Sequence, residues 1–506
     1  MKLFSLVFLA CLPRLSAPVE TPSFPETHAG RHLEELLVAF NAGDEASLRA
    51  WEREHRDAAS RERQSADAVV AALRGVRSQT GSLRPEKILT DQAFVSSVLV
   101  EFENVAAWGE LRVTCAPEPP HGVLSFTVVP AEPPSEPVSY EGWETLPDLL
   151  HKAALDGGLP ALAVAVTTKD RILDKGVVGL RVAGGRDAVQ LDDRFHFGSV
   201  TKAMTATAAA VLVERGELRW DVTLRESFPS LSMLPEYEPV TLVQLLNHRG
   251  GIPRHMTFDE PTMARLNGLP GAADEQRALY VAEVLSETPV AQPGTAMHYS
   301  NAGYAIAGHI AERASGRSWE DLLHEEVFDP LGMALSDIGW PASGGRQAQP
   351  LGHANSQPVP VDAYVLGAFM HPAGDVHGSI EDLARFAQAH LKGLAGEDGV
   401  LRAETVQRLH STAPTQGYAG GWMVERRDDG SELHWHNGSA GTFYALVVLE
   451  PRADRAVVLA TNTGGPRCET VAWKVVEELR ARRGGDDRAA HDRHAKTPAA
   501  AETDGR

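Results

Sequence analysis

The chain has 506 residues, a length that favours two or more domains over a single hydrophobic core. Hydrophobic residues make up 43% and charged residues 23%, which is typical of a folded globular protein and excludes disorder throughout. The formal net charge of −20 argues against nucleic acid or an anionic membrane surface as a partner, because both call for a basic face. Cys11, Cys115 and Cys468 are too few for a disulfide framework or a zinc cluster, although one bridge stays open.

Residues 1–20 have the pattern of an export signal. Lys2 gives a positive start, Leu3–Leu12 is a short apolar run, and Leu15–Ala17 offers a small-residue cleavage site, although Pro18 leaves the cut itself open. Because the run is too short to span a membrane, we expect a periplasmic or secreted protein without stable membrane insertion. The end of the run also weakly matches a lipoprotein signal, so a lipid anchor at Cys11 is the alternative.

Residues 28–130 are expected to form a small α+β domain. An amphipathic helix comes first, with apolar positions at Leu33, Leu36, Leu37 and Phe40. Two more helical stretches follow, and then four alternating segments predict antiparallel strands, around Ile88 and at Phe94–Phe102, Leu111–Cys115 and Val123–Val129. The phrase Phe40–Asp44 after the first helix resembles the cone-shaped NTF2-like domains. Since the region shows no catalytic set, the resemblance implies a spacer or a binding role.

Two low-complexity stretches mark the limits of a second domain at residues 140–482. Residues 131–139 include the run Ala131–Pro137, which is rich in Pro and Glu and predicts a stiff, extended linker. Residues 483–506 are rich in Gly, Asp, Arg, Ala and His without periodicity, which predicts a disordered tail.

The second domain has strand candidates at both of its ends. A helix with Leu146, Leu149 and Leu150 comes first and is followed by two strand candidates, Leu162–Val166 and Val177–Leu180. Four more lie near the end of the domain, at Gly421–Glu425, His434–Asn437, Thr442–Glu450 and Ala456–Ala460. Helical segments occupy the middle. This order predicts an α+β fold in which one antiparallel sheet, closed by both ends, is flanked by helices and carries an inserted helical subdomain.

Phe197–Lys202 places a hydroxyl and an amine three residues apart at the start of an apolar helix. Residues three apart share a helix face, so Ser199 and Lys202 are expected to point into one space. The ordinary alternatives are a helix-capping serine and a lysine that reaches solvent along its aliphatic stem. A single S-x-x-K is a weak signal, and its meaning depends on what other segments add.

Two further phrases follow in the chain. Pro293–Tyr304 is a tight turn that leads into a helix and delivers Tyr299 and Asn301 to the same side of a loop. His436-Asn437-Gly438-Ser439 is a strand end made of small residues, against which a substrate backbone could lie. Together with Ser199 and Lys202, these phrases form a three-part candidate site.

The three phrases resemble the serine β-lactamase and penicillin-binding-protein superfamily, closest to class C β-lactamases and their esterase and D-aminopeptidase relatives. Ser199–Lys202 matches S-x-x-K, Tyr299–Asn301 matches Y-x-N, and His436–Gly438 stands where those families carry K-T-G or H-x-G. Lesser phrases agree, including Leu245–Pro253, Pro330–Met333, Pro372–Gly374 and Asp382–Phe386. The resemblance covers roughly residues 140–482.

The resemblance implies a role for each residue. Ser199 is the expected nucleophile, and Lys202 is its base, with a pKa lowered by burial and by the helix N-terminus. Tyr299 would relay the proton and protonate the leaving group, its own pKa lowered by the nearby cation. Asn301 would orient Lys202 and bind the substrate. The backbone N–H groups of Ser199 and, after Gly438, of Ser439 would bind the oxyanion.

His436 replaces the lysine of K-T-G, which points away from a carboxylate-bearing substrate, because histidine is only partly charged near neutrality. The function expected is an exported serine hydrolase of small esters or amides. The alternatives are a D,D-peptidase or weak class C-type β-lactamase acting on cell-wall peptides or β-lactams, and an inactive binding module. A structural role for His436 in its strand also stays open, and so does the oligomeric state.

No cofactor is expected. His298, His371 and His377 have a spacing that matches no familiar metal-ligand pattern. His248 is interpreted mainly as structural, although the family motif would put it beneath the floor of the site. The expected partner is a small ester, amide or peptide substrate.

Overall fold

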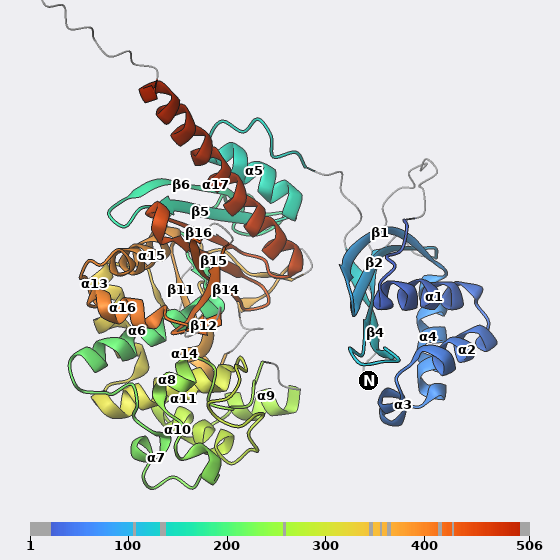
Figure 1. Ribbon diagram of the computed structural model, residues 1–506, viewed down its shortest axis with the longest axis horizontal. Coiled ribbons are helices and arrows are strands. Elements are labelled where there is room, and N and C mark those ends of the chain that lie inside the picture. The colour runs from blue at the N-terminus through green and yellow to red at the C-terminus, as the bar shows by residue number, and fades with distance from the viewer. Residues whose placement is uncertain are drawn as a thin grey trace, which may run out of the picture. The chain divides into compact units, whose positions relative to one another are not determined.

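Figure 1 shows a computed structural model of the chain. It describes residues 22–104, 108–131, 138–256, 260–343, 348–354, 357–361, 366–412, 417–427 and 430–495. The chain divides into two compact units, Met1–Pro137 and Val138–Arg506. The predicted signal with Cys11, most of the linker and the end of the predicted tail lie outside the described residues, so these stay predictions.

The first unit packs helices against a four-stranded antiparallel sheet of order β1-β2-β3-β4. Its described elements are α1 (His28–Ala42), α2 (Glu45–His55), α3 (Ala58–Arg63), α4 (Ala66–Thr80), β1 (Leu83–Gln92), β2 (Val95–Phe102), β3 (Trp108–Cys115) and β4 (Val123–Ala131). Three helices thus follow the first, whereas the sequence predicted two. The apolar stripe of α1, which includes Leu33 and Phe40, is buried in one core with Val98, Val100 and Leu111. Gly43, in the left-handed region with φ 81°, ends α1.

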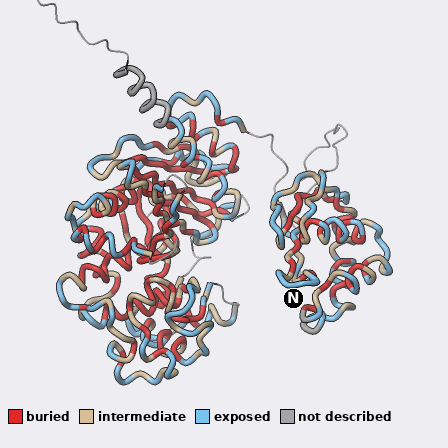
Figure 2. Tube along the Cα trace, in the orientation of Figure 1, coloured by how far each residue is buried: buried red, intermediate tan, exposed pale blue. Residues whose placement is uncertain are grey.

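The second unit is built on a seven-stranded antiparallel sheet of order β12-β13-β14-β15-β16-β5-β6. Its strands come from both ends of the unit, as the sequence predicted: β5 (Ala161–Thr167), β6 (Ile172–Gly179), β12 (Gly417–Ala419), β13 (Trp422–Arg426), β14 (Glu432–Ser439), β15 (Tyr444–Glu450) and β16 (Arg455–Thr461). The central strands β5, β15 and β16 are buried along nearly their whole length (Figure 2). Helices cover both faces, which is why these strands are almost continuously apolar.

Helices flank this sheet on both faces (Figure 1). On one face, α5 (Leu146–Gly157) and α17 (Pro466–Ala495) share a core with β5, β15 and β16. On the other, α6 (Thr201–Glu214) and α15 (Ile380–Leu394) bury residues such as Ala203, Met204 and Leu383 against the same strands. Helix α6 is buried from Thr201 to Leu212, so it runs between the sheet and the helical part of the unit.

A helical subdomain lies between β6 and β12 in the chain. Its longer helices are α9 (Glu260–Asn267), α10 (Ala273–Val284) and α11 (Asn301–Ser315), and its shorter ones are α7 (Leu224–Ser227), α8 (Leu242–Leu246), α12 (Trp319–Leu323), α13 (Asp329–Leu331), α14 (His371–Gly374) and α16 (Ala403–Leu409). Short strands β7 (Phe195–His196), β11 (Val376–Gly378) and β8 (Asp337–Ile338) form a small sheet beside it, and β9 (His353–Ala354) pairs with β10 (Gln357–Pro358). The α6, α8, α10 and α11 helices share one apolar core.

The structure bears on the predicted tail, on a possible disulfide bridge and on membrane-spanning helices. Helix α17 continues to Ala495, whereas the sequence predicted a tail without secondary structure from residue 483; the Ala, Arg and Asp residues there are compatible with a helix despite their lack of apolar periodicity. Cys115 and Cys468 are both buried free thiols, so they form no bridge. Among the described residues, none of the helices is long and apolar enough to cross a membrane.

A chain of three buried histidines runs beside α6. Thr207 Oγ1 on α6 lies 3.2 Å from His390 Nε2, His390 Nδ1 lies 3.0 Å from His410 Nε2, and His410 Nδ1 lies 3.1 Å from His434 Nδ1. Burial is the main cause that lowers the pKa of His390 to about 3 and that of His434 to about 4. These rings are therefore uncharged at neutral pH.

Candidate active site

Ser199 lies in a single 3-10 turn, Gly198–Val200, that leads directly into α6. Gly198 has φ 52°, a left-handed value that suits glycine, and the residue at the helix N-cap is Val200, which makes no side-chain cap. The Ser199 hydroxyl therefore caps no helix. It instead accepts a hydrogen bond of 3.0 Å from Lys202 Nζ, as the three-residue spacing predicted.

Lys202 is wholly buried, and its ammonium position is surrounded by neutral acceptors. Its Nζ lies 3.0 Å from Ser199 Oγ, 2.8 Å from Asn301 Oδ1 and 2.6 Å from the carbonyl oxygen of Ala373. As an ammonium it donates to all three, and as a neutral amine its two hydrogens serve Asn301 and Ala373 while its lone pair accepts from the Ser199 hydroxyl. Burial holds the pKa of Lys202 well below its usual value, since no carboxylate compensates for the lost water. A lysine that reaches solvent is thus excluded, and the amine is suited to accept a proton.

Tyr299, in the loop before α11, and Asn301, the first residue of that helix, reach the same place. Ser300 caps that helix by accepting from the backbone N–H of Gly303, which fixes its two neighbours. Asn301 uses its oxygen for Lys202 and donates through Nδ2 to the carbonyl of His255 at 3.2 Å, so one of its two amide hydrogens is left over. The Lys202 Nζ lies 4.9 Å from the centre of the Tyr299 ring.

The protonation of Tyr299 differs from the sequence-based expectation. Burial raises the pKa of its phenol to about 12, and a side-chain hydrogen bond with Ser199 offsets only part of that rise. The cation expected to lower this pKa does not do so, because burial shifts Lys202 itself towards its uncharged form. Tyr299 is therefore a neutral proton donor, and Lys202 is the group suited to be the base.

The end of β14 packs directly on the turn that carries Ser199. A Cβ on Gly438 would lie 2.5 Å from Ser199 N, and a Cβ on Gly198 would lie 2.6 Å from Ser439 N. Neither residue can be larger, because the two backbones approach too closely. This close approach brings the backbone nitrogens of Ser199 and Ser439 near each other at the turn that carries the Ser199 hydroxyl.

His436 is buried and engaged through both ring nitrogens. Nε2 accepts from the Tyr418 hydroxyl at 3.1 Å, and Nδ1 donates to the carbonyl of Asn437. Burial lowers the pKa of His436 to about 3, and Lys202 lowers it further if charged. The ring is uncharged at neutral pH rather than partly charged, so it is placed to hold Tyr418 rather than to offer a charge to substrate.

His248 lies beneath Tyr299, with the two ring centroids 4.2 Å apart. Its Nδ1 accepts from the backbone N–H of Ser300 at 3.1 Å, and burial holds its pKa well below the usual value. A hydrogen-bond acceptor at Nδ1 requires the proton on Nε2, which is buried without a hydrogen-bond partner. His248 thus supports the loop that carries Tyr299 and Asn301.

The comparison with known protein families decides the assignment of the second unit. Residues 144–481, two thirds of the chain, match the family model described as Beta-lactamase. The chain belongs to the beta-lactamase family. As a member, it is a serine hydrolase of the superfamily that also includes penicillin-binding proteins and esterases. The NTF2-like resemblance of the first unit stays a prediction.

Three curated relatives and one solved structure illustrate the match. The chain is 29% identical to Penicillin-binding protein 4 of Amycolatopsis lactamdurans (65% of this chain, 86% of that protein), 30% to Unguisins hydrolase ungD' of Aspergillus campestris (60% and 59%) and 28% to Lovastatin esterase of Penicillium rubens (38% and 52%). Thus it spans little more than half of the two fungal proteins. The octameric penicillin-binding protein homologue from Pyrococcus abyssi shares the fold (TM-score 0.56, 23% identity, 66% of this chain and 77% of that chain).

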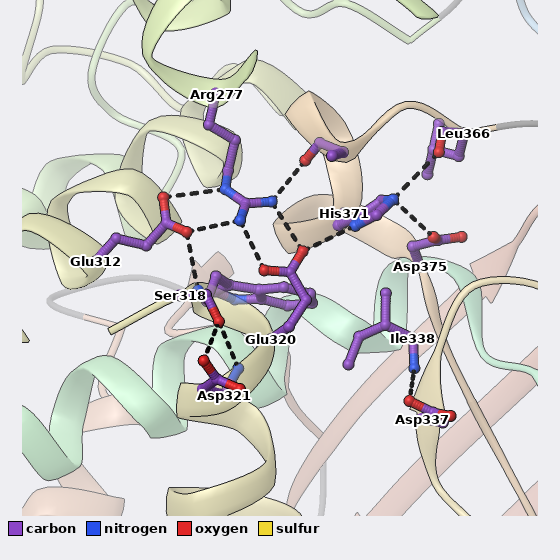
Figure 3. Close-up of polar contacts among 12 residues, drawn as sticks. Arg277, Glu312, Ser318, Glu320, Asp321, Asp337, Ile338, Leu366, His371 and Asp375 are labelled. Atoms are coloured by element: carbon purple, nitrogen blue, oxygen red, sulfur yellow. Dashed lines mark hydrogen bonds and ion pairs between the residues drawn. The ribbon is translucent and has the colours of Figure 1, made fainter. Parts of the chain in front are cut away.

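A buried ionic network supports this family member's site from the helical subdomain (Figure 3). Arg277 donates to both oxygens of Glu312 and of Glu320, and to the carbonyl of Ala368. His371 then bridges Glu320, at 3.0 Å from Nδ1, and Asp375, at 3.3 Å from Nε2. Burial opposes ionisation of Glu320, but the hydrogen bonds from His371 and Arg277 outweigh it and lower its pKa to about 2.

This network ends at the catalytic turn. Asp375 accepts from His196 Nε2 at 3.0 Å, and His196 Nδ1 accepts from the backbone N–H of Gly198 at 3.1 Å. Ala373, whose carbonyl binds Lys202, lies between His371 and Asp375 on α14. His371 and Asp375, which flank this segment, therefore also fix the position of the Lys202 acceptor and of the turn before Ser199.

The structure brings together Ser199, Lys202, Tyr299, Asn301 and the Gly438-Ser439 backbone, all from the sequence-based set. Sequence reasoning missed Ala373 as an acceptor, although the phrase Pro372–Gly374 had signalled the segment, and it missed Tyr418, for which no signal exists beyond an isolated aromatic residue. The histidines weighed as metal ligands are used otherwise: His371 binds Glu320 and Asp375, His377 Nδ1 lies 2.7 Å from the Gly339 carbonyl oxygen, and the backbone N–H of His298 donates to His248.

Proposed function

We propose that the enzyme hydrolyses small esters or amides through an acyl-Ser199 intermediate. The observation that carries this is the wholly buried Lys202, whose Nζ lies 3.0 Å from the Ser199 hydroxyl among neutral acceptors of the described residues, and whose pKa burial holds well below its usual value. A serine hydroxyl is a weak nucleophile until a base takes its proton, and Lys202 is in place to do so.

In this mechanism Ser199 Oγ attacks the substrate carbonyl while its proton passes to Lys202. The N–H groups of Ser199 and Ser439 stabilise the negative oxygen that forms. The Tyr299 phenol, neutral with a pKa of about 12, relays the proton from Lys202 to the leaving alcohol or amine. Water then attacks the acyl-enzyme, Lys202 accepts its proton, and the acid leaves as Ser199 is reprotonated. Asn301 holds Lys202 throughout and has one amide hydrogen for the substrate.

The neutral state of His436 supports ester or amide substrates without a carboxylate at that position. A permanent cation there would favour such a carboxylate, and His436 has a pKa of about 3 and donates to a backbone carbonyl instead. A relative named for esterase activity is consistent with this choice. The relatives named Penicillin-binding protein 4 and Beta-lactamase keep a D,D-peptidase or weak β-lactamase as the second candidate.

An inactive binding module is the third candidate, and the assembled site opposes it. Loss of activity usually removes the nucleophile, the base or the proton donor, whereas Ser199, Lys202 and Tyr299 are all present and in contact. We further propose export to the periplasm or the medium, supported by the sequence pattern of residues 1–20. The role proposed for the first unit is that of a spacer or binding module.

The test is to incubate the purified protein with a fluorophosphonate, a p-nitrophenyl ester and a penicillin, and to weigh it by mass spectrometry. We expect a covalent adduct with the first two reagents, absent in Ser199→Ala and present in the control Ser286→Ala, an exposed serine on the helical subdomain. An adduct that persists in Ser199→Ala contradicts the nucleophile assignment. An adduct with penicillin alone supports the second candidate, and no adduct with any reagent supports the third.

A further inference from the structure

The first unit carries two histidines and a carboxylate that face one another across two helices. His32 and Glu35 are three residues apart on α1, and His55 is the last residue of α2. Their ligand atoms, one from each residue, all lie within 4.8 Å of one another. Because His55 comes from a second helix, the sequence spacing hides this group. We propose that His32, Glu35 and His55 bind a Zn²⁺ ion.

The distances within the group fit a tetrahedral metal. His32 Nδ1 lies 3.2 Å from His55 Nδ1, Glu35 Oε2 lies 3.2 Å from His55 Nδ1, and Glu35 Oε2 lies 3.7 Å from His32 Nδ1. Zinc–nitrogen and zinc–oxygen bonds of about 2.0–2.1 Å at tetrahedral angles place the ligand atoms about 3.3–3.4 Å apart. The three observed edges bracket that value, so an ion fits without a change of backbone.

The surroundings hold the ligands in this orientation. His32 makes a hydrogen bond to the backbone of His121, and the Trp51 ring lies one turn before His55 with its centroid 6.0 Å away. Such contacts to the far side of a ligating imidazole are typical of metal sites, because they fix the ring that faces the ion. Asp44 caps α2 at its other end and Gly43 ends α1, so the two helices are joined by a short, defined turn.

The donor set selects the class of metal. Two imidazoles and one carboxylate suit Zn²⁺, whereas Mg²⁺ and Ca²⁺ prefer oxygen ligands alone. The side chains of His32 and His55 are 18% and 20% exposed and that of Glu35 is 50% exposed, so the fourth position opens to solvent and takes a water. Three protein ligands with one open position characterise zinc sites that bind a further ligand.

A different arrangement of the same residues needs no metal. A protonated imidazole between its neighbour and Glu35 would also give contacts near 3.2 Å. The two arrangements differ in what they predict for added zinc, since the hydrogen-bonded cluster has no affinity for it.

The experiment uses the full chain, stripped of metal by a chelator and dialysed. Zn²⁺ is titrated against a chromogenic chelator, and Co²⁺ is added separately to record its visible absorption bands. We expect one high-affinity Zn²⁺ per chain, tetrahedral Co²⁺ bands, and no competition from millimolar Mg²⁺ or Ca²⁺. His32→Gln, His55→Gln and Glu35→Gln should each weaken this site, the histidine variants by about 100-fold or more.

Matched controls are Glu34→Gln, the exposed neighbour of Glu35 on α1, and His151→Gln, an exposed histidine on α5. Both should bind zinc like the parent protein. At 100-fold excess over the dissociation constant, zinc should raise the Tm of the first unit by about 10–20 °C in the parent and not in His55→Gln. Far-UV circular dichroism shows that the variants are folded.

Failure to bind zinc, or binding that is unchanged in the double variant His32→Gln/His55→Gln, overturns the proposal. Covalent labelling of Ser199 reports on the second unit alone, so its result stands independently of this one.

Discussion

Lys202 and Arg277 are two buried cationic residues of the second unit, and their surroundings are opposite. Both side chains are 0% exposed. Arg277 meets two carboxylates, Glu312 and Glu320, and all five of its N–H groups are used. Lys202 meets a hydroxyl, an amide oxygen and a carbonyl. The difference teaches that a counter-charge, not burial alone, decides whether a buried cation is a fixed charge or a base.

The pKa shifts express this contrast. Burial lowers the pKa of both residues, but at Arg277 the hydrogen bonds that it donates to Glu312 and Glu320 more than reverse the effect and raise the pKa, whereas at Lys202 burial is the one cause of the shift. The two sites are also connected. The charged site holds His371 through Glu320, and α14, which begins at His371, supplies the carbonyl that binds Lys202. The ionic network around Arg277 therefore helps to position the Ala373 carbonyl that binds Lys202.

The largest effect is expected from removal of the base. Lys202→Met should lower kcat by about 10⁴-fold, the upper range for general acid–base catalysis. Lys202→Arg should lose nearly as much, because a guanidinium cannot give up its proton near neutrality. The kcat for a p-nitrophenyl ester measures both. An arginine variant with near-normal kcat would show that a cation, and not a base, is what the site needs.

Arg277→Met should lower the free energy of unfolding by about 3–5 kcal/mol, since it takes the shared guanidinium away from the buried Glu312 and the partly buried Glu320. Urea denaturation measures this change. Arg265→Met, which removes an exposed partner of Glu283, is the control and should change stability little. Equal losses in the two variants would contradict the view that the buried cluster is a structural element.

Asn301→Asp gives Lys202 the counter-charge that it lacks. A carboxylate at hydrogen-bond distance raises a lysine pKa by about one to three units, so at pH 7 less of the lysine in the variant is unprotonated and kcat should fall by about 10-fold or more. Because the pKa is raised, activity should return as the pH is increased. The control Asn301→Leu removes the hydrogen bond without adding charge, and its pH profile should not move upward. An unshifted profile in Asn301→Asp would count against Lys202 as the base.

The histidine chain His390–His410–His434 extends the comparison to groups that titrate near neutrality. Folding lowers the pKa of His390 to about 3 and of His434 to about 4, mainly by burial. Above the unfolded pKa of about 6.5 they contribute no pH dependence. As the pH falls below it, the unfolded chain binds protons that the folded chain does not, so stability is lost, by about 2 kcal/mol for each ring at pH 5.

Urea denaturation between pH 7 and pH 5 measures this slope. His434→Gln should reduce it, because one buried imidazole no longer titrates only in the unfolded state. A slope unchanged by His434→Gln would show that the fall in stability comes from other groups.

The parts of the site that local spacing determines could be predicted from the sequence. Ser199 and Lys202 are one helical turn apart, and Tyr299 and Asn301 flank the residue that caps α11, so each pair has little freedom. The assembly of the sheet from both ends of the unit was also predicted from strand patterns alone. The edge strand β12 was not predicted, because it is only three residues long.

The rest depends on contacts between distant segments. Ala373 contributes a backbone carbonyl, which any residue type carries, so no side chain marks it. His436 is held by Tyr418, eighteen residues away in the chain and on another strand, and burial in the assembled core keeps its ring uncharged. The pKa of Tyr299 was expected to fall and instead rises to about 12, because its degree of burial is a property of the whole core. The ion pair between Arg277 and Glu320 likewise joins residues that are 43 positions apart in the chain, so local spacing does not reveal it.

The order of strands in the second unit has a consequence for synthesis of the chain. Ser199 emerges from the ribosome about 240 residues before Ser439, and β5 cannot pair with β16 until nearly the whole unit has been made. The growing polypeptide therefore carries Ser199 long before the Gly438-Ser439 backbone that packs on its turn. If the proposed mechanism holds, the last strands to be translated complete the site, and a chain that stops before them lacks the second N–H group proposed to bind the oxyanion.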